Sequence, residues 1–304
     1  MDLEQKAIER IRLASEMSLQ HYKQPLICTY SGGKDSDVML ELFRRSGVPF
    51  EVRHGLTTAD APQTVRHVKK VFRDLELRDV KATVSYPTYK GERTSMWRLI
   101  PQKKMPPTRF VRYCCEVLKE NNGNGRYIAT GVRWAESTAR SRRSEFEKMG
   151  KSKKEAEHFS TVMLLEDNDA KRRMTEMCMQ KREMIVNPII DWGNTDIWKY
   201  IESEKIETCE LYKCGYDRVG CIGCPMAGKK RWKEFRDFPT YERAYKKAFE
   251  RMLEELKKTR KSVEWKNAEE VFLWWMEDEN ISGQMSLWDF PEILPGQQKG
   301  EHSV

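Results

Sequence analysis

The sequence predicts an α/β fold with a doubly wound, five-stranded parallel sheet and a helical C-terminal extension. In the N-terminal quarter of the chain, short apolar runs typical of buried strands alternate with segments of helical periodicity. The first apolar run is followed directly by a glycine turn and then by a helix, and from residue 229 onward the pattern is helical. Strand–helix alternation of this kind is typical of a parallel sheet covered by helices on both faces.

The predicted elements follow one another in a regular order. Residues 3–22 repeat apolar side chains at about 3.6-residue spacing and predict an N-terminal amphipathic helix, which Pro25 ends. Helical periodicity resumes at 37–45, and Pro62 fits the first position of a further helix. Five apolar runs predict the strands, at residues 26–30, 49–54, 81–85, 126–130 and 183–187.

The same patterns divide the chain into three parts. Residues 1–23 form the N-terminal helix, and residues 24–228 form the α/β domain. Within that domain, residues 139–182 are rich in Arg, Lys, Glu and Met and predict a basic insertion of helix and loop with little strand character. Residues 229–304 predict the helical extension, with helices at 241–258 and 264–279 and a polar tail.

Composition excludes several classes of protein. With 39% hydrophobic residues and nine Trp among 304 residues, the chain has enough apolar mass for a core and is not globally disordered. No apolar run approaches the ~18 residues of a membrane helix, and the N-terminus has no signal-peptide core, so we expect a cytoplasmic protein without a membrane partner. Structural disulfides are rare there, so the eight cysteines require another explanation. The net charge of +8 permits an anionic partner.

A glycine-containing loop after the first predicted strand is the first chemical signal. Glycines let backbone N–H groups converge, the following helix adds positive partial charge at its N-terminus, and a lysine adds a full charge. The loop has neither the Walker A spacing nor that of a dinucleotide fingerprint. The alternative is an ordinary Gly-Gly turn capped by Ser or Asp. The predicted phosphate-binding residues are Ser31, Gly32, Gly33, Lys34, Asp35 and Ser36.

Four cysteines form the second signal: the adjacent pair Cys114 and Cys115, and the C-x-x-C pair Cys221 and Cys224. Four thiolates suit tetrahedral zinc or an iron–sulfur cluster. Adjacent cysteines converge poorly on a single ion, which favours [4Fe–4S] over zinc. A thioredoxin-like redox role for the C-x-x-C pair is disfavoured by its position in the chain. Of the other cysteines, Cys28 and Cys178 are expected to be structural, and Cys209 and Cys214 are alternative ligands or bystanders.

Polar residues beside two other predicted strands complete the candidate site. Arg133 follows the strand at 126–130, at the edge where ligands of open α/β sheets bind, and Arg140 lies a few residues further on. Arginine suits bidentate contacts with phosphate or sulfate. Thr57 and Asp60 follow the second strand and are candidates for contact with ribose or adenine. The alternatives are a solvated charged face for the arginines and a capped loop for Thr57 and Asp60.

Five motifs in order make up a recognisable pattern: SGGKDS, the pair CC, GVRWAES at 131–137, NPIIDW at 187–192 and GYDRVGCIGCP at 215–225. The chain resembles the phosphoadenosine phosphosulfate (PAPS) reductase / adenylyl-sulfate reductase family of the N-type ATP pyrophosphatases, including its shorter members from phages and other mobile elements. The resemblance implies an adenine nucleotide alpha hydrolase-like fold whose SGGKDS loop holds nucleotide phosphates. It also implies that Cys114, Cys115, Cys221 and Cys224 ligate a [4Fe–4S] cluster.

One departure bears on the expected reaction. Assimilatory reductases of the family carry a C-terminal Glu-Cys-Gly-Leu-His segment with a nucleophilic cysteine, and no cysteine follows Cys224 here. The expected function is therefore an enzyme of sulfur metabolism or sulfur transfer that binds ATP, adenosine 5′-phosphosulfate (APS) or PAPS. Lys34 and Arg133 are its predicted catalytic residues, Mg²⁺ is a further candidate cofactor, and a sulfur or electron donor protein is an expected partner.

Three alternatives remain open at this point. The first is an ATP pyrophosphatase that activates DNA or tRNA for sulfur incorporation, as in DNA phosphorothioation. The second is a non-catalytic regulator that binds a nucleotide or a nucleic acid. The third is a zinc-stabilised module without redox or sulfur chemistry. The basic insertion and the net charge of +8 would suit an anionic target.

Overall fold

The computed structural model describes residues 2–119, 125–138, 140–148, 184–259 and 265–277. Its centre is a six-stranded sheet of order β3-β2-β1-β6-β8-β7. The strands are β1 (Leu26–Thr29), β2 (Phe50–Gly55), β3 (Ala82–Ser85), β6 (Tyr127–Ala129), β7 (Phe146–Lys148) and β8 (Met184–Val186). All pairings from β3 to β8 are parallel, which confirms the five predicted parallel strands.

The sixth strand was not expected. Strand β7 pairs antiparallel with β8 at the edge of the sheet, within the stretch 139–182 that the sequence predicts to be helix and loop. That prediction is wrong at 146–148, and residues 149–182 lie outside the described part of the chain. Tertiary contacts decide the local structure here. The Asn187 side chain donates to Ser144 O at 2.8 Å and to Glu147 Oε1 at 2.9 Å, and so holds this segment against the end of β8.

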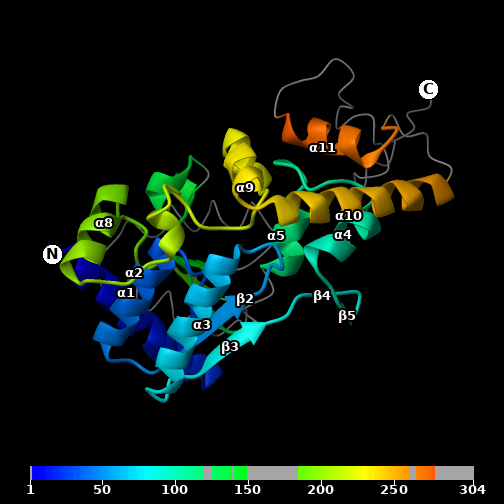
Figure 1. Cartoon of the computed structure of the whole chain (residues 1–304). Helices are drawn as coiled ribbons and strands as arrows, with labels where there is room; N and C mark the ends of the chain where they lie inside the picture. Colours follow the sequence, from blue (N-terminus) through cyan, green and yellow to red (C-terminus); the bar gives the residue numbers. More distant parts are fainter. Residues whose placement is uncertain (1, 120–124, 139, 149–183, 260–264, 278–304) are drawn as a thin grey trace, which may run out of the picture.

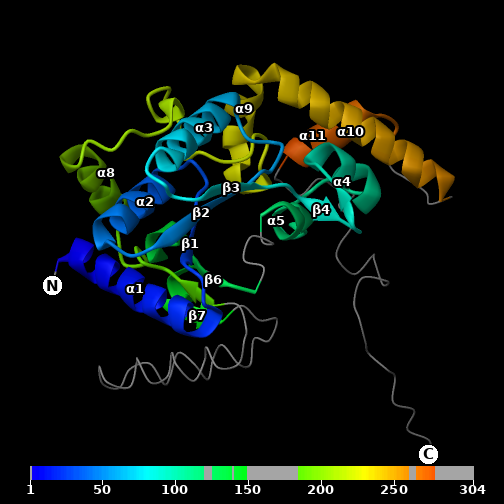
Figure 2. The ribbon, with the colours of Figure 1, turned by 90° about the horizontal axis from the view of Figure 1, so that it is seen from below.

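Helices flank the sheet and form a second body at one end of it (Figures 1 and 2). The first group is α1 (Leu3–Met17) with its π-helical continuation (Ser18–Tyr22), α2 (Lys34–Ser46), α3 (Pro62–Glu76) and α8 (Asn194–Ser203). The second group is α4 (Met96–Lys103), α5 (Tyr113–Leu118), α9 (Arg231–Asp237), α10 (Pro239–Lys258) and α11 (Ala268–Met276). A short hairpin of β4 (Thr88–Tyr89) and β5 (Glu92–Arg93) precedes α4. None of the helices in these ranges is long and apolar enough to cross a membrane.

Strand β1 shows how the sheet faces two apolar clusters. Leu26 and Cys28 belong to the main core with α1, α2 and α3, whereas Ile27 joins Ile128 and Ile185 in a small cluster. These three isoleucines are neighbours in register on β1, β6 and β8. Because successive side chains of a strand point to opposite faces, the small cluster lies on the opposite face of the sheet.

The second large core crosses the predicted boundary at residue 228. It combines α4 and α5 with α10 and α11, and it includes Ile222 of the C-x-x-C turn. In both views α10 lies beside α4, with α11 packed on α10 (Figures 1 and 2). The helical extension is therefore packed into the same body as the cysteine-bearing segments.

Candidate functional site

The SGGKDS loop connects β1 to α2 and approaches α3 closely. Gly32 has a φ of 76°, a left-handed conformation that favours glycine. A Cβ atom at this position would lie 2.9 Å from Val68 Cγ2 and 3.1 Å from Thr64 Cγ2. Residue 32 is thus restricted to glycine both by its backbone angle and by its contact with α3.

Hydrogen bonds within the loop fix its shape without a ligand. Ser36 Oγ donates to Gly33 O at 2.7 Å and accepts from Gly33 N at 3.1 Å. Ser31 Oγ lies 3.2 Å from Ser36 Oγ. The predicted serines therefore build the loop and place the N-terminus of α2, which provides the positive end of a helix dipole.

The charged residues of the loop form a short chain of ion pairs. Lys34 Nζ lies 3.2 Å from Asp35 Oδ2, and Arg133 Nε lies 2.8 Å from Asp35 Oδ1. Arg133 is only 1% exposed, and its two other guanidinium nitrogens donate to Trp192 O and Asn194 Oδ1. The buried Arg133 guanidinium thereby orients the Asp35 carboxylate. Its predicted catalytic role stays a prediction.

Tyr212 is a loop contact that sequence reasoning did not identify. It ends a short 3₁₀ turn (Glu210–Tyr212), and its hydroxyl accepts a hydrogen bond from Lys34 N at 2.9 Å. The N-terminal N–H groups of a helix have no partner inside the helix, so this is the position that a phosphate oxygen would use. Trp198 packs edge-on against the ring, with centroids 5.3 Å apart. No motif surrounds Tyr212, so only the fold could reveal this contact.

A buried polar group supports the first turn of α2. Asp37 Oδ1 accepts from Tyr30 Oη at 2.5 Å and lies 2.9 Å from His67 Nε2. Burial raises the pKa of Asp37, and the hydrogen bonds from His67 and Tyr30 oppose that rise. These three residues tie β1, α2 and α3 together directly beneath the phosphate loop.

The four predicted cysteines come together in the structure. Cys114 and Cys115 lie at the start of α5, and Cys221 and Cys224 lie in the turn before the 3₁₀ segment Pro225–Lys230. The pKa of Cys114 is raised by its hydrogen bond to Cys115 and by burial, with further contributions from Cys221 and Cys224. The pKa of Cys115 is lowered by its hydrogen bond with Cys114, against burial, and by Arg112.

Cations at the two ends of α5 compensate the charge of this thiol set. Arg112 donates to Cys115 Sγ at 3.3 Å. The pKa of Lys119 is raised by Cys221 first and then, against burial, by Asp60, Cys115 and Cys224. A positively charged environment of this kind stabilises thiolates, which are the form that binds metals.

The donor set fits separate metal corners better than a single ion. Across the described residues, no group of three or more His, Cys, Asp or Glu side chains could hold one metal ion. A tetrahedral zinc site needs its thiolates to converge on one point, whereas each thiolate of a [4Fe–4S] cluster binds its own iron. The four interacting cysteines, with Arg112 and Lys119 beside them, are compatible with such a cluster.

Thr57 and Asp60 form one wall of the thiol site. Asp60 Oδ2 accepts from Thr57 N at 3.0 Å, and the Asp60 backbone pairs with Cys221 as an isolated antiparallel bridge. Ile222 N donates to Ala59 O at 2.8 Å. Burial raises the pKa of Cys221, and Lys119 and a hydrogen bond with the Thr57 side chain oppose that rise. These residues therefore join the end of β2 to the cysteine turn, while their predicted contact with ribose or adenine stays a prediction.

The C-terminal helices form the opposite wall. Gly223, inside the C-x-x-C turn, has a φ of 74°, and a Cβ atom there would lie 2.5 Å from Phe235 Cζ and 2.9 Å from Tyr245 Cε2. Tyr245 Oη donates to Ile222 O at 3.0 Å, and Gly223 N donates to Glu234 Oε2 at 2.7 Å. The backbone of the turn is thus held by side chains of α9 and α10.

One segment connects the phosphate loop with the thiol set. Tyr212 contacts Lys34, Val219 O lies 3.9 Å from the Cβ position at Gly33, and Cys221 pairs with Asp60. The chain from 212 to 224 therefore passes the loop and ends at the cysteines. The two predicted sites are neighbouring parts of one region.

The remaining sequence-predicted residues lie elsewhere. Arg140 is at the surface in the 3₁₀ segment Arg140–Arg142, where it pairs with Glu136. Cys28 is buried in β1, and Cys209 is buried in the second core. Cys214 is exposed, and Cys178 lies outside the described residues.

A parallel sheet with a glycine loop at the end of its first strand defines a nucleotide-binding α/β protein, here with a thiol set beside the loop. The chain belongs to the phosphoadenosine phosphosulfate reductase domain family, whose model matches residues 25–227.

Relatives in sequence are distant. Two uncharacterised proteins of Methanocaldococcus jannaschii, MJ0066 and MJ0973, are 25% and 26% identical over 71% and 74% of this chain. The matches cover 40% and 47% of those proteins, so the chain spans less than half of their length. An adenosine 5′-phosphosulfate reductase of Neisseria meningitidis is 40% identical over 38 residues, which are 12% of this chain and 16% of that protein.

The similar solved structures are distant in sequence as well. The PAPS reductase from Candida auris, in a phosphate complex, has a TM-score of 0.43 and 17% identity, covering 71% of this chain and 88% of that one. The U34-tRNA thiolase NcsA from Methanococcus maripaludis, with its [4Fe-4S] cluster, has a TM-score of 0.42 and 11% identity, covering 85% and 81%. At these scores the likeness gives no information on the activity of this chain.

Proposed function

We propose that this protein is an enzyme that binds an adenine nucleotide by its phosphates at the SGGKDS loop and cleaves it in sulfur transfer, beside a [4Fe–4S] cluster. The observation on which this rests is the segment 212–224, which contacts the phosphate loop at one end and holds Cys221 and Cys224 at the other. Membership of the PAPS reductase domain family supports the same reading.

The loop residues have distinct roles in this proposal. The first turn of α2 and the Lys34 ammonium stabilise negative charge on the leaving phosphate. Asp35, held by Arg133, fixes the position of that ammonium at 3.2 Å. Because the loop is held in shape by Ser31 and Ser36 before a ligand binds, little reorganisation is needed on binding.

The cluster would be held by Cys114, Cys115, Cys221 and Cys224, with Lys119 and Arg112 compensating its charge. When bound, it supplies an iron–sulfur centre whose properties depend on net charge and on hydrogen bonds to sulfur. The protein's contribution is to place that centre next to the nucleotide and to enclose it between the end of β2 and α10.

Nucleotide turnover tests the first part of the proposal. We expect wild-type protein to release pyrophosphate from ATP, or sulfite from APS or PAPS, and Lys34→Ala to lose at least 100-fold in rate, on the order of one lost oxyanion contact. Lys70→Ala is the matched control, because Lys70 is exposed and pairs only with Glu207 among the described residues. Absence of binding to all three nucleotides would contradict the proposal.

Metal content tests the second part. Anaerobically purified protein should be brown, with visible iron–sulfur absorbance and about four irons per chain. Cys221→Ser should remove the colour, whereas Cys214→Ser, at an exposed thiol, should keep it. A colourless protein that contains zinc would refute the cluster assignment.

A further inference from the structure

The positive charge of this protein is concentrated in one segment. Residues 86–112 contain seven Lys or Arg and one Glu, a net charge of +6, whereas the whole chain has +8. This segment includes the β4–β5 hairpin, α4 and the loop that leads to the cysteine pair. A local excess of this size is a typical electrostatic feature of a surface that binds a polyanion.

Several cations of this segment have no carboxylate partner within the described residues. In the α/β part, several arginines pair with carboxylates: Arg44 with Asp74, Arg45 with Glu4, Glu41 and Glu204, and the buried Arg126 with Glu51. In contrast, none of five cations pairs with a carboxylate anywhere in the described ranges. These five are Lys90, Arg93, Arg98, Lys103 and Lys104.

Exposed aromatic rings lie among these cations. Phe110 is 91% exposed and Tyr86 is 54% exposed, which is unusual for rings of this size. The Arg93 guanidinium lies 4.5 Å from the centre of the Tyr86 ring, and Lys103 Nζ lies 4.6 Å from that of Tyr89. Stacking rings interleaved with cations are the means by which proteins bind unpaired bases and their phosphates.

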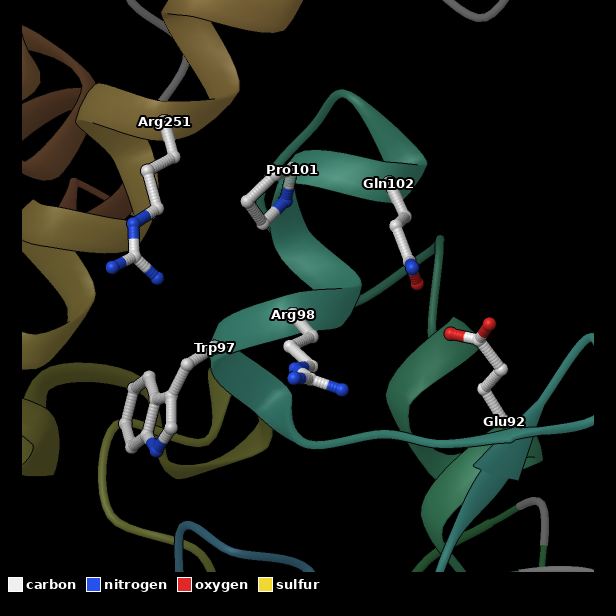
Figure 3. A pocket seen from close by; sticks show the side chains of 6 residues that line it. All are labelled: Glu92, Trp97, Arg98, Pro101, Gln102 and Arg251. Atoms are coloured by element: carbon white, nitrogen blue, oxygen red, sulfur yellow. The ribbon is translucent and has the colours of Figure 1, made fainter.

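A cavity of about 320 Å³ opens between α4 and α10 next to these residues. Figure 3 shows the Trp97 indole and the Arg251 guanidinium on one side of it, Gln102 and Glu92 on the other, and Arg98 between them. Neither Arg98 nor Arg251 has a carboxylate partner in the described part of the chain. An indole with two guanidinium groups and an amide suits a nucleobase together with its phosphate.

This face continues to the thiol set. Arg109 Nε donates to Pro225 O at 3.3 Å, directly after Cys224, and Arg112 donates to Cys115 Sγ. Trp275 Nε1 donates to Pro107 O at 2.7 Å and fixes the same loop to α11. A polyanion bound along the β4–β5 hairpin and α4 would therefore reach the cysteines at the Arg109–Arg112 end.

We propose that this basic aromatic face, residues 86–112 with Arg251, binds single-stranded nucleic acid. The unpaired cations contact the phosphates, and Phe110, Tyr86 and the α4–α10 cavity take the bases. A single strand is favoured over a duplex because paired bases cannot stack on exposed rings. The proposal deepens the proposed function by naming its acceptor, and it is tested by binding alone, so that either can fail without the other.

Fluorescence anisotropy with labelled 20-nucleotide single-stranded RNA and DNA tests the proposal, with an RNA duplex and polyglutamate as competitors. We expect saturable binding to at least one single strand, with affinity falling steeply as salt increases, and weaker binding to the duplex and to polyglutamate. The better of the two single strands identifies the acceptor as RNA or DNA. Absence of binding, or equal competition by polyglutamate, would overturn the proposal.

Variants locate the bound strand on the surface. Phe110→Ala should weaken binding about tenfold through lost stacking. Arg98→Ala with Arg251→Ala should weaken it and reduce the salt slope by about two phosphate contacts. Leu77→Ala, an exposed apolar residue on the opposite body, and Lys70→Ala are the controls. An unchanged circular dichroism spectrum and thermal unfolding midpoint would show that each variant is folded, and equal effects in the controls would refute the location.

Discussion

At the scale of single residues, the Tyr212 hydroxyl occupies a position that a ligand would use. It accepts the Lys34 N–H at 2.9 Å, at the N-terminus of α2. Burial raises the pKa of Tyr212, so the group is a neutral phenol at physiological pH and a modest acceptor. A phosphate oxygen is a stronger acceptor for the same N–H because it carries charge. In the proposed function, a phosphate of the nucleotide would displace this hydroxyl from the Lys34 N–H.

This displacement gives a measurable prediction. Tyr212→Phe removes the competing acceptor, so we expect pyrophosphate and ATP to bind about fivefold more tightly, equivalent to about 1 kcal/mol for one neutral hydrogen bond. Isothermal titration calorimetry measures the affinity. Tyr216→Phe is the control, since that hydroxyl donates to Asp237 away from the loop. Weaker binding by the Tyr212 variant would mean that the hydroxyl contacts the nucleotide directly.

The residues of the loop and of the thiol set could be found from the sequence because their motifs are local. Glycines, serines and a lysine that are adjacent in the chain lie in the same loop. Each cysteine pair is also local in sequence, so the fold has only to bring the two pairs together. Tyr212 and Asp60 could not be assigned, because their roles depend on contacts with residues about 180 and 160 positions away. No spacing rule encodes such contacts.

At the scale of elements, the C-x-x-C turn depends on helices that follow it. Gly223 packs against Phe235, Tyr245 and Trp275, whose rings also pack on one another. Arg231, fully buried, donates to Trp275 O and Met276 O and so anchors α11 to α9. The sequence predicts α10 and α11 from their apolar stripes, but not that their aromatic side would enclose the cysteine turn.

A single methyl group tests this dependence. Gly223→Ala places a Cβ atom 2.5 Å from a Phe235 ring carbon in a left-handed backbone conformation, so we expect destabilisation of about 3 kcal/mol and loss of iron binding. Gly91→Ala is the matched control, with a φ of 85° and open space around its Cβ position. Urea unfolding and iron content measure the two effects. Full iron content in the Gly223 variant would contradict the dependence.

The elements that the sequence missed are short or determined by tertiary contacts. Strand β7 has three residues, and the β4–β5 hairpin has two per strand. The N-cap residue of helix α8 is Gly193, which has no side-chain oxygen of the kind that Asn, Ser or Asp provides. Instead, Asp196 Oδ2 accepts a hydrogen bond from Gly193 N at 2.7 Å. Sequence periodicity needs several turns or alternations before it is distinguishable from chance. Strands β6 and β8 also have three residues, but their sequences YIA and MIV are apolar, whereas FEK in β7 is not.

At the scale of the whole molecule, α1 is fixed to the far edge of the sheet by one arginine. Arg10 donates to Asp191 Oδ1 at 2.7 Å and to Pro188 O at 2.9 Å, and it also pairs with Glu145. Burial raises the pKa of Asp191, but the hydrogen bond and charge of Arg10 outweigh that effect, and the pKa is lowered overall. The N-terminal helix is thereby linked to β8 and β7.

The lowered pKa sets the pH dependence of stability. A carboxylate whose pKa falls on folding stabilises the fold above its unfolded pKa of about 3.9, and this stabilisation is lost as the pH falls through the lower, folded value. Arg10→Met should therefore lower the free energy of unfolding by about 3 kcal/mol at pH 7 and by clearly less at pH 3. Arg12→Met is the control, because Arg12 donates to Ser46 O and pairs with no carboxylate among the described residues. Urea unfolding at both pH values measures the free energy of unfolding. A loss of stability that is the same at both pH values would contradict this account.

The contact of Gly223 with Trp275 has a consequence for biogenesis. On the ribosome, Lys34 emerges about 240 residues before Trp275, which at ~5–20 residues per second is an interval on the order of 10 to 50 s. The nucleotide loop can form early in that interval, but the wall behind the cysteine turn is complete only when α11 has been synthesised. The proposed cluster would therefore be enclosed only after α11 has been synthesised, and a nascent chain interrupted before α11 would leave the cysteine turn without this wall.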